Sequence, residues 1–256
     1  MKTIIDLQRI EYRYPGNEEY TLKDLDLKLT ENEKIGMIAS NGSGKTTLFH
    51  IIMGLTKPSS GTIEIFGKDM IDEKDFIDVR KKIGLLFQDA DDQLFCPTVI
   101  EDVAFGPLNQ GKTKDDALEI ASDTLSFLGI ESFKDRINFK LSGGEKRLVS
   151  LATVLAMKPE AILLDEPTTG LDEKTKDKLI EVLAKLDLPS IIISHDAEFV
   201  NKVTSKIYTI KEGKVLTDKD IYLHSHVHAH PHDSDHKHEH TGTVHSHGHP
   251  HGRDEI

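Results

Sequence analysis

The feature that most limits the possible folds is a glycine-rich loop between a short apolar stretch and an apolar helix. Residues 34–38 (KIGMI) have the composition of a buried strand, and KTTLFHIIMG, from residue 45 onward, that of a helix. A loop of this kind gathers free backbone N–H groups and the positive end of the helix dipole at one point, which makes an anion site. The sequence therefore predicts a phosphate-binding loop on an α/β sheet.

Several residues of this loop have predicted roles toward a nucleoside triphosphate. Lys45 is expected to reach the β- and γ-phosphates, and the Thr46 hydroxyl to ligate Mg²⁺. The first glycine of the usual pattern is replaced by Ala39, which is tolerated if φ is negative there. The alternative is an ordinary turn before a helix. The predicted ATP-binding residues of the loop are Ser40, Asn41, Gly42, Ser43, Gly44, Lys45, Thr46 and Thr47.

Polar side chains follow three more apolar stretches that read as buried strands. The run AILL ends in Asp165 and Glu166, KIGLLF ends in Gln88, and SIIIS ends in His195. Ligands of open α/β sheets bind where parallel strands end, so we expect these side chains to share one site. We predict that Asp165, with Thr46 and Gln88, holds Mg²⁺, and that Glu166, His195 and Gln88 are catalytic. Glu166 would orient the attacking water and His195 would contact the γ-phosphate, unless these are only polar strand ends.

Three tyrosines near the N-terminus are candidates for contact with an adenine ring. Residues 5–14 alternate approximately as a strand, which we expect to end just before Pro15–Gly16. Tyr14, at the end of this strand, is predicted to stack on adenine, which is worth roughly 1–3 kcal/mol by analogy with base–aromatic stacking. Tyr12 and Tyr20 are competing candidates, and Tyr12 fits a core position better.

The segment LSGGEKR, residues 141–147, resembles the signature sequence of ATP-binding cassette ATPases. In that family the signature contacts the γ-phosphate bound by the opposite protomer, and a stacking aromatic occupies the Tyr14 position. The resemblance therefore implies a dimer, a homodimer or a heterodimer, with Asp172 of TTGLD at its interface. Ser142 is also expected to cap the helix that follows it. The predicted signature residues are Leu141, Ser142, Gly143, Gly144 and Glu145.

The order of the motifs implies an α/β fold with a P-loop NTPase (RecA-like) core. A small antiparallel β subdomain is expected from residues 1–33 and 61–66, and an inserted helical subdomain from about 95–157. The segment IYTIKEGKVLT, with its Glu-Gly turn, reads as a closing hairpin. We predict an ABC transporter ATP-binding domain over 1–222 and a separate tail over 223–256.

Composition limits the partners and the compartment. The formal net charge of −12 argues against nucleic acid as the main partner, and the single cysteine, Cys96, suits a reducing compartment. No apolar run approaches the roughly 18 residues that span a bilayer, and the N-terminus lacks the apolar region of a signal peptide. We therefore expect a soluble chain at the cytoplasmic face of the cell membrane, bound peripherally to partner chains.

The stretch after Gln88 resembles one particular group within this family. DADDQLFCPTVIEDVAFGPLNQG resembles the corresponding region of energy-coupling-factor transporter ATPases, especially the cobalt/nickel group. In that family this region forms a groove for helices of a transmembrane coupling protein, which works with a substrate-binding membrane subunit. Phe95, Val99 and Phe105 are candidates for either the groove or the core.

The C-terminal segment contains 12 of the 14 histidines, and its composition predicts disorder in the free chain. In the opening HSHVHAHPH the histidines alternate, and an extended chain would place them on one face. Neutral imidazoles suit Ni²⁺, Co²⁺, Zn²⁺ and Cu²⁺, and the resemblance favours nickel or cobalt. A solvated linker or an engineered tag is the alternative. The candidate ligands are His224, His226, His228, His230, His232, His236, His238, His240, His245, His247, His249 and His251.

These observations predict an ATPase that energises import of nickel or cobalt through transmembrane partners. The alternatives are the ATPase of another micronutrient (vitamin) importer, and a metal-storage protein with a weakly active cassette. A soluble ATPase of DNA repair or translation would need a coiled-coil insertion or a second cassette, and the sequence contains neither. The intact Lys45, Asp165 and Glu166 argue against pure storage.

Overall fold

The computed structural model describes residues 2–40 and 42–216. Asn41, predicted to belong to the phosphate-binding loop, lies outside the described residues. The 12 histidines predicted to bind metal, His224 to His251, lie outside them as well.

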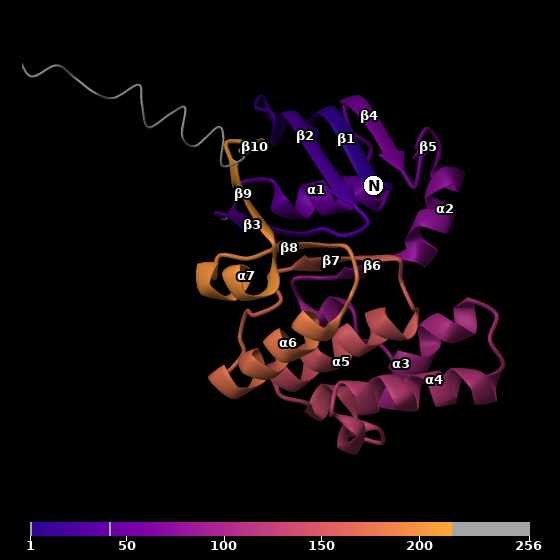
Figure 1. Ribbon diagram of the computed structural model, residues 1–256. Helices are drawn as coiled ribbons and strands as arrows, with labels where there is room; N and C mark the ends of the chain where they lie inside the picture. The colour runs from indigo at the N-terminus through magenta and orange to yellow at the C-terminus, as the bar shows by residue number, and fades with distance from the viewer. Residues whose placement is uncertain (1, 41, 217–256) are drawn as a thin grey trace, which may run out of the picture.

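One sheet of the described fold is antiparallel, with the strand order β2-β1-β4-β5 (Figure 1). Apolar residues alternate along β2, where Leu25, Leu27 and Leu29 are buried between exposed neighbours, as expected for a sheet with one face in the core. The first strand ends at Tyr12 instead of continuing to Tyr14, because the chain turns there and Asn17 N–H donates to the Tyr14 carbonyl. The strands are β1 (Thr3–Tyr12), β2 (Leu22–Thr30), β4 (Ser60–Ile65) and β5 (Lys68–Asp69).

The second sheet has the order β10-β9-β3-β8-β7-β6, and its strands from β9 to β6 are parallel. The predicted hairpin at its edge is confirmed: β9 and β10 are antiparallel, and Glu212 and Gly213 both have positive φ, 52° and 79°. Positive φ at both turn residues matches the twist of the flanking strands. The strands are β3 (Lys34–Ala39), β6 (Ile83–Leu86), β7 (Ala161–Asp165), β8 (Ser190–Ile193), β9 (Lys206–Lys211) and β10 (Lys214–Leu216).

Helices lie between the sheets and on the far face of the parallel sheet (Figure 1). Helix α1 lies between the two sheets, while α3, α4, α5 and α6 lie on the other side of the parallel strands. The helices are α1 (Lys45–Ile52), α2 (Glu73–Lys82), α3 (Val99–Asn109), α4 (Lys114–Phe127), α5 (Gly143–Ala156), α6 (Glu173–Lys185) and α7 (Ala197–Val203).

The parallel strands are buried on both faces, which explains their unbroken apolar sequences. Along β7, Leu163 packs with α1 and the antiparallel sheet, whereas Ile162 and Leu164 pack with the helices on the other face. This sandwich of layers confirms the predicted α/β P-loop fold with an antiparallel sheet. It also directs the ends of β3, β7 and β8 to one edge.

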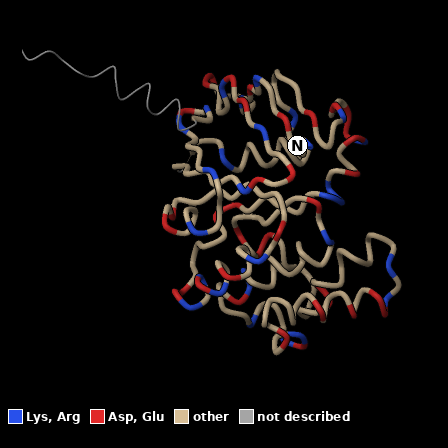
Figure 2. Tube along the Cα trace, in the orientation of Figure 1, with Lys and Arg blue, Asp and Glu red and all other residues tan. Residues whose placement is uncertain are grey.

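Acidic and basic residues are interspersed over all layers of the described chain (Figure 2). Neither sign is confined to one layer in this view.

Candidate nucleotide site

The glycine loop connects β3 to α1 as predicted. Ala39 is the last residue of β3 and pairs with Ile210, so its extended backbone accepts alanine without strain. Gly44 has a φ of 95°, and an added Cβ there would lie 2.6 Å from Leu22 Cδ2. Position 44 therefore needs glycine for both its backbone conformation and its packing. Helix α1 begins at the next residue, Lys45.

Thr46 and Asp165 meet across the loop. The Thr46 hydroxyl donates to Asp165 Oδ2 over 2.8 Å. Asp165 ends strand β7 and is 2% exposed, and this burial raises the pKa of its carboxyl above the ordinary value despite the Thr46 hydrogen bond. Its other oxygen, Oδ1, is buried without a hydrogen-bond partner among the described residues.

These oxygen atoms fit a hard divalent cation. Mg²⁺ is usually held by one or two carboxylates together with substrate phosphates and waters, and a hydroxyl beside a buried carboxylate supplies suitable ligands. An orphaned Oδ1 beside the phosphate loop is what such an ion would satisfy. The Ser43 hydroxyl is buried in the loop with no partner in the described structure and fits a phosphate oxygen in the same way.

Glu166 is held between a lysine and a histidine. Lys45 Nζ lies 2.6 Å from Glu166 Oε1, and His195 Nδ1 lies 2.7 Å from Glu166 Oε2. Burial raises the pKa of Glu166, but the Lys45 contact and the His195 hydrogen bond outweigh it, so the pKa lies below its usual value. Glu166 has a φ of 46°, an uncommon conformation that directs the chain out of β7. The structure thus brings together three predicted residues from three segments.

Gln88 lies two residues beyond the end of β6 and is exposed. It lines a surface hollow of about 600 Å³ together with Thr46, Asp89 and Gly143, so it lies across this hollow from the first turn of α1. The predicted signature residue Gly143 therefore borders the same hollow.

Arg147 is a residue whose role the sequence did not indicate. It lies in α5, is 3% exposed, and its guanidinium donates to the carbonyl oxygens of Phe87, Gln88 and Glu166, the last over 3.0 Å. Arg147 thereby fixes the backbone on both sides of the site. A charged residue among the apolar residues of a helix was the available signal, but its three partners are set by tertiary structure.

Tyr14 is the tyrosine closest to the phosphate loop by contact. Its hydroxyl is 2.8 Å from Thr47 Oγ1, its ring packs edge-on against Tyr12 at 4.9 Å, and it is 43% exposed. Tyr20, also exposed, lies against Arg13. Tyr14 therefore combines partial exposure with a position fixed by its contact with Thr47.

The predicted signature residues begin helix α5. Ser142 is its N-cap, and its side chain accepts from Glu145 N–H, which confirms the expected cap. The Glu145 carboxylate accepts from Ser142 N–H over 2.8 Å and from Arg136 over 2.6 Å; the Arg136 contact is the main reason that its pKa falls to about 2. Leu141 is buried, whereas Ser142 and Gly143 are exposed. Gly144 is half-buried.

Asp172, predicted at a dimer interface, is exposed and caps helix α6. Its carboxylate accepts from Thr175 N–H over 2.9 Å, and this hydrogen bond lowers its pKa. The exposed position leaves Asp172 accessible to a partner chain.

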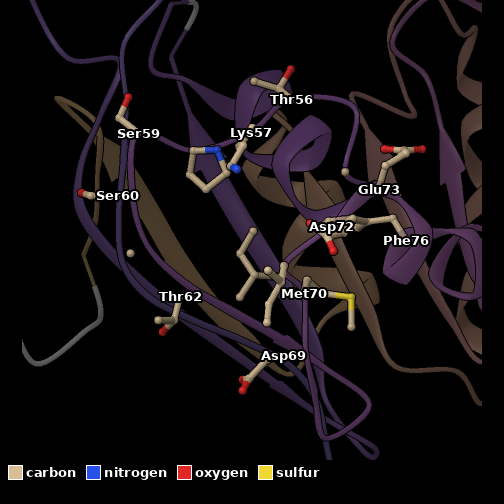
Figure 3. A pocket seen from close by; sticks show the side chains of 15 residues that line it. Thr56, Lys57, Ser59, Ser60, Thr62, Asp69, Met70, Asp72, Glu73 and Phe76 are labelled. Atoms are coloured by element: carbon tan, nitrogen blue, oxygen red, sulfur yellow. The ribbon is translucent and has the colours of Figure 1, made fainter.

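A second hollow, of about 650 Å³, lies away from these residues, between the end of α1, strand β4 and the start of α2 (Figure 3). Met70 and Phe76 contribute apolar surface, and the carboxylates of Asp69, Asp72 and Glu73 lie around it. None of the predicted nucleotide residues lines this hollow.

Within residues 2–40 and 42–216, no helix is long and apolar enough to cross a membrane. The same part of the chain has no group of three or more His, Cys, Asp or Glu side chains placed to hold a metal ion.

The strand–loop–helix with its buried carboxylates defines a P-loop nucleotide-binding protein. A family model described as ABC transporter matches residues 22–169, more than half of the chain. The chain belongs to the family of ABC transporter ATP-binding cassettes, and it is an ATP-hydrolysing subunit that energises a transporter.

Individual relatives add detail. EcfA of Methanothermobacter thermautotrophicus, an energy-coupling factor transporter ATP-binding protein, is 39% identical over 219 residues, which cover 84% of this chain and 70% of that protein. The structure of cbiO1 from Clostridium perfringens, part of the ABC transporter complex cbiONQ, is 31% identical with a TM-score of 0.76, covering 90% of this chain and 96% of that one. A dimeric cassette bound to ADP and Pi is 28% identical with a TM-score of 0.77, covering 83% and 96%. Other relatives, 45–47% identical, have only a general ABC transporter ATP-binding description.

Proposed function

We propose that this chain is the ATPase of an energy-coupling-factor type importer for nickel or cobalt ions. The observation that carries the transporter type is the similarity to EcfA and to cbiO1 over most of the chain, together with the exposed aromatic residues Phe95 and Phe105. An ATPase for another micronutrient importer is the second candidate, because relatives of this kind do not fix the substrate.

The nucleotide chemistry follows from the site. Lys45 would bind the β- and γ-phosphates, and Thr46, Asp165 and Gln88 would hold Mg²⁺. When bound, Mg²⁺ neutralises charge on the phosphates. Glu166 orients the attacking water, and His195, already within hydrogen-bond distance of Glu166, contacts the γ-phosphate.

The site is proposed to be completed by a second cassette. Ser142 and Gly143 are exposed at the N-terminus of α5, where the helix dipole favours a phosphate. The similarity to a dimeric cassette that holds ADP and Pi supports this arrangement. Asp172 would then lie at the interface, and Tyr14 would stack on the adenine of its own nucleotide.

The proposed docking surface for transmembrane partners consists of Phe95, Phe105 and Leu108. These side chains are 64%, 44% and 42% exposed, and the rings of Phe95 and Phe105 contact each other at 4.7 Å in a T-shaped pair. Val99, the third sequence candidate, is fully buried and belongs to the core. An exposed aromatic pair of this kind suits an apolar helix of a partner. Such a partner would place the chain at the cytoplasmic face of the membrane.

The two proposed domains correspond to two proposed functions, ATP hydrolysis and metal binding. The ATP-binding domain is proposed to span 1–222, with a helical subdomain at about 95–157 that contains α3, α4 and α5. Residues 223–256 would form a metal-binding tail whose 12 histidines deliver or buffer Ni²⁺ or Co²⁺. Since the described residues contain no group of three or more His, Cys, Asp or Glu side chains placed to hold a metal ion, the proposal of nickel or cobalt binding rests on this tail alone.

Purification from membranes tests the transporter type. The full chain, isolated from its native membranes in mild detergent, should carry with it a transmembrane coupling protein and a substrate-binding subunit, identified by mass spectrometry. Reconstituted into vesicles, the complex should import ⁶³Ni or ⁵⁷Co only with ATP. Import of a vitamin in place of the metals would support the second candidate, and isolation without any membrane chain would refute both.

Deleting residues 223–256 tests the tail separately. The truncated chain should keep its ATPase activity and lose most of its Ni²⁺ and Co²⁺ binding in calorimetric titrations. Binding by the full chain should weaken as pH falls through about 6.5, because protons compete for imidazole nitrogens. Equal binding by both chains would show that the tail is not the metal site.

A further inference from the structure

The segment that presents Phe95 is anchored by a buried carboxylate. Asp102, in the first turn of α3, is 2% exposed, and its Oδ1 accepts from the backbone N–H of Phe95 over 3.2 Å and of Cys96 over 3.0 Å. Phe95 is therefore an exposed ring on a backbone that is fixed from inside. A displacement of this backbone has to move Asp102 or break two charge-assisted hydrogen bonds.

The second oxygen of Asp102 is bound by Asn138, a residue that precedes the signature. Asn138 is 6% exposed, and its Nδ2 donates to Asp102 Oδ2 and to the Cys96 carbonyl, the latter over 2.8 Å. Its backbone N–H donates to the Pro97 carbonyl over 3.1 Å, and its own carbonyl accepts from Leu141 N–H over 3.1 Å. Asn138 thus contacts the Phe95 segment on one side and the first signature residue on the other.

Further backbone contacts hold the segment that follows Cys96, where α3 begins. Val99 N–H donates to the Arg136 carbonyl over 3.0 Å, and Thr98 and Ile137 form an isolated β-bridge. Arg136 in turn binds both oxygens of Glu145, at 2.6 and 3.2 Å, and Glu145 accepts from Ser142 N–H. The start of α3 and the start of α5 are therefore joined by a continuous set of hydrogen bonds.

We propose that Asp102 and Asn138 form a positioning pair that couples the Phe95–Phe105 docking surface to the signature Ser142–Gly144. The inference rests on the proposed function, in which a partner helix occupies that surface and the signature completes a nucleotide site. A partner that moves the Phe95 segment shifts Asn138, and hence the N-terminus of α5. The coupling is reciprocal, so nucleotide closure on the signature also alters the Phe95 segment.

The proposed coupling depends on the side-chain amide of Asn138 and not on its backbone hydrogen bonds alone. Asn138→Leu keeps a similar side-chain volume but removes both Nδ2 hydrogen bonds, while the Pro97 and Leu141 backbone bonds stay in place. Asp102→Asn is a milder change, since an amide oxygen still accepts from Phe95 and Cys96 but an NH₂ group then faces Asn138. Gln110→Leu is the matched control, because it deletes the side-chain amide at the C-cap of α3, which donates to the Met157 carbonyl outside this network.

Hydrogen exchange of the full-length chain tests the coupling without a membrane partner. The probe is adenylyl imidodiphosphate with Mg²⁺. In the wild type and in Gln110→Leu, it should slow exchange both in residues 141–147 and at the amides of Phe95 and Cys96, by at least about fivefold, the lower end of typical coupling. In Asn138→Leu, and to a smaller degree in Asp102→Asn, slowing should persist at 141–147 and be lost at Phe95 and Cys96.

The outcomes separate the inference from the function on which it rests. The positioning pair is refuted, while the composite site survives, if the nucleotide slows exchange in the wild type at 141–147 but not at Phe95 and Cys96. It is also refuted if the nucleotide slows exchange at both segments in Asn138→Leu. If the wild type changes at neither segment, the proposed composite site fails and the inference fails with it. If Asn138→Leu does not fold, exchange in Asp102→Asn at the same two segments distinguishes these outcomes.

Discussion

The ion pair between Lys45 and Glu166 leads to a prediction about both stability and turnover. Their charged atoms are 2.6 Å apart, and the side chains are 8% and 2% exposed. At an effective dielectric constant of about 20, two charges at this distance attract by about 6 kcal/mol, most of which is offset by the desolvation of both groups. Glu166→Gln keeps the shape and an acceptor oxygen but removes the negative charge.

The loss of charge assistance is expected to reduce the free energy of unfolding without nucleotide by about 1–2 kcal/mol, the difference between a charged and a neutral hydrogen bond. This corresponds to a melting temperature lower by about 2–8 °C for a chain of this size. In the wild type, Lys45 has to exchange Glu166 for the triphosphate, whereas the variant lacks that competition. We therefore expect ATP to bind the variant about 5- to 30-fold more tightly.

Turnover should change in the opposite direction. Without a carboxylate to orient water, phosphate release should fall by about 10²–10⁴-fold. Thermal unfolding with and without ATP, calorimetric ATP binding and a phosphate-release assay measure the three effects. Glu160→Gln is the control, because its exposed pair with Lys82 should contribute less than about 1 kcal/mol. Wild-type turnover in Glu166→Gln would show that Glu166 does not orient the water, and an unchanged melting temperature would show that the ion pair does not stabilise the fold.

Three further changes have defined outcomes. Tyr14→Ala should weaken ATP binding by about 1–3 kcal/mol while Tyr14→Phe keeps most of it, since stacking needs only the ring; equal loss in both would assign the effect to the hydroxyl. Gly36→Ala should reduce the free energy of unfolding by about 1–3 kcal/mol in denaturant titrations, because the added Cβ would lie 2.2 Å from Val200 Cγ1; no loss would mean that α7 moves freely. The pKa of Glu145 is lowered from 4.5 to about 2, so its pair with Arg136 stabilises the fold above pH 4.5, and this contribution is lost as pH falls toward 2. The stability difference between wild type and Glu145→Gln should therefore shrink steadily below pH 4.5, and a constant difference would contradict this assignment.

Local patterns were sufficient for the nucleotide loop and the strands around it. Apolar runs followed by Asp165, Glu166 and His195 predict buried parallel strands with polar ends, and parallel strands bring those ends to one edge of a sheet. The hairpin at Glu212 could also be predicted from the sequence. Its tight turn requires positive φ at two adjacent residues, and the glycine of the Glu-Gly pair adopts positive φ without strain. These predictions depend on short stretches whose geometry is fixed by the chain itself.

Contacts between distant segments could not be predicted in this way. The three carbonyl partners of Arg147 come from two strand ends, and the Asp102–Asn138 hydrogen bond joins residues 36 positions apart. Nothing in the local sequence specifies that a helix arginine or a loop asparagine will face those groups. The pairing of Lys45 with Glu166 was also not foreseen, because the motif describes both residues by their contacts with a nucleotide.

Complementation between two inactive variants tests most directly whether a second copy of the chain completes each ATP site. Lys45→Ala damages the phosphate loop and Gly143→Asp damages the signature, so each homodimer has one defect in every site. In the mixed dimer both defects fall in one site and the other is intact. We predict that each variant alone is nearly inactive in phosphate release, and that the equimolar mixture recovers up to about a quarter of wild-type activity if dimers exchange freely and sites act independently. Wild-type activity in either variant alone, or a mixture no more active than its components, would contradict the shared site.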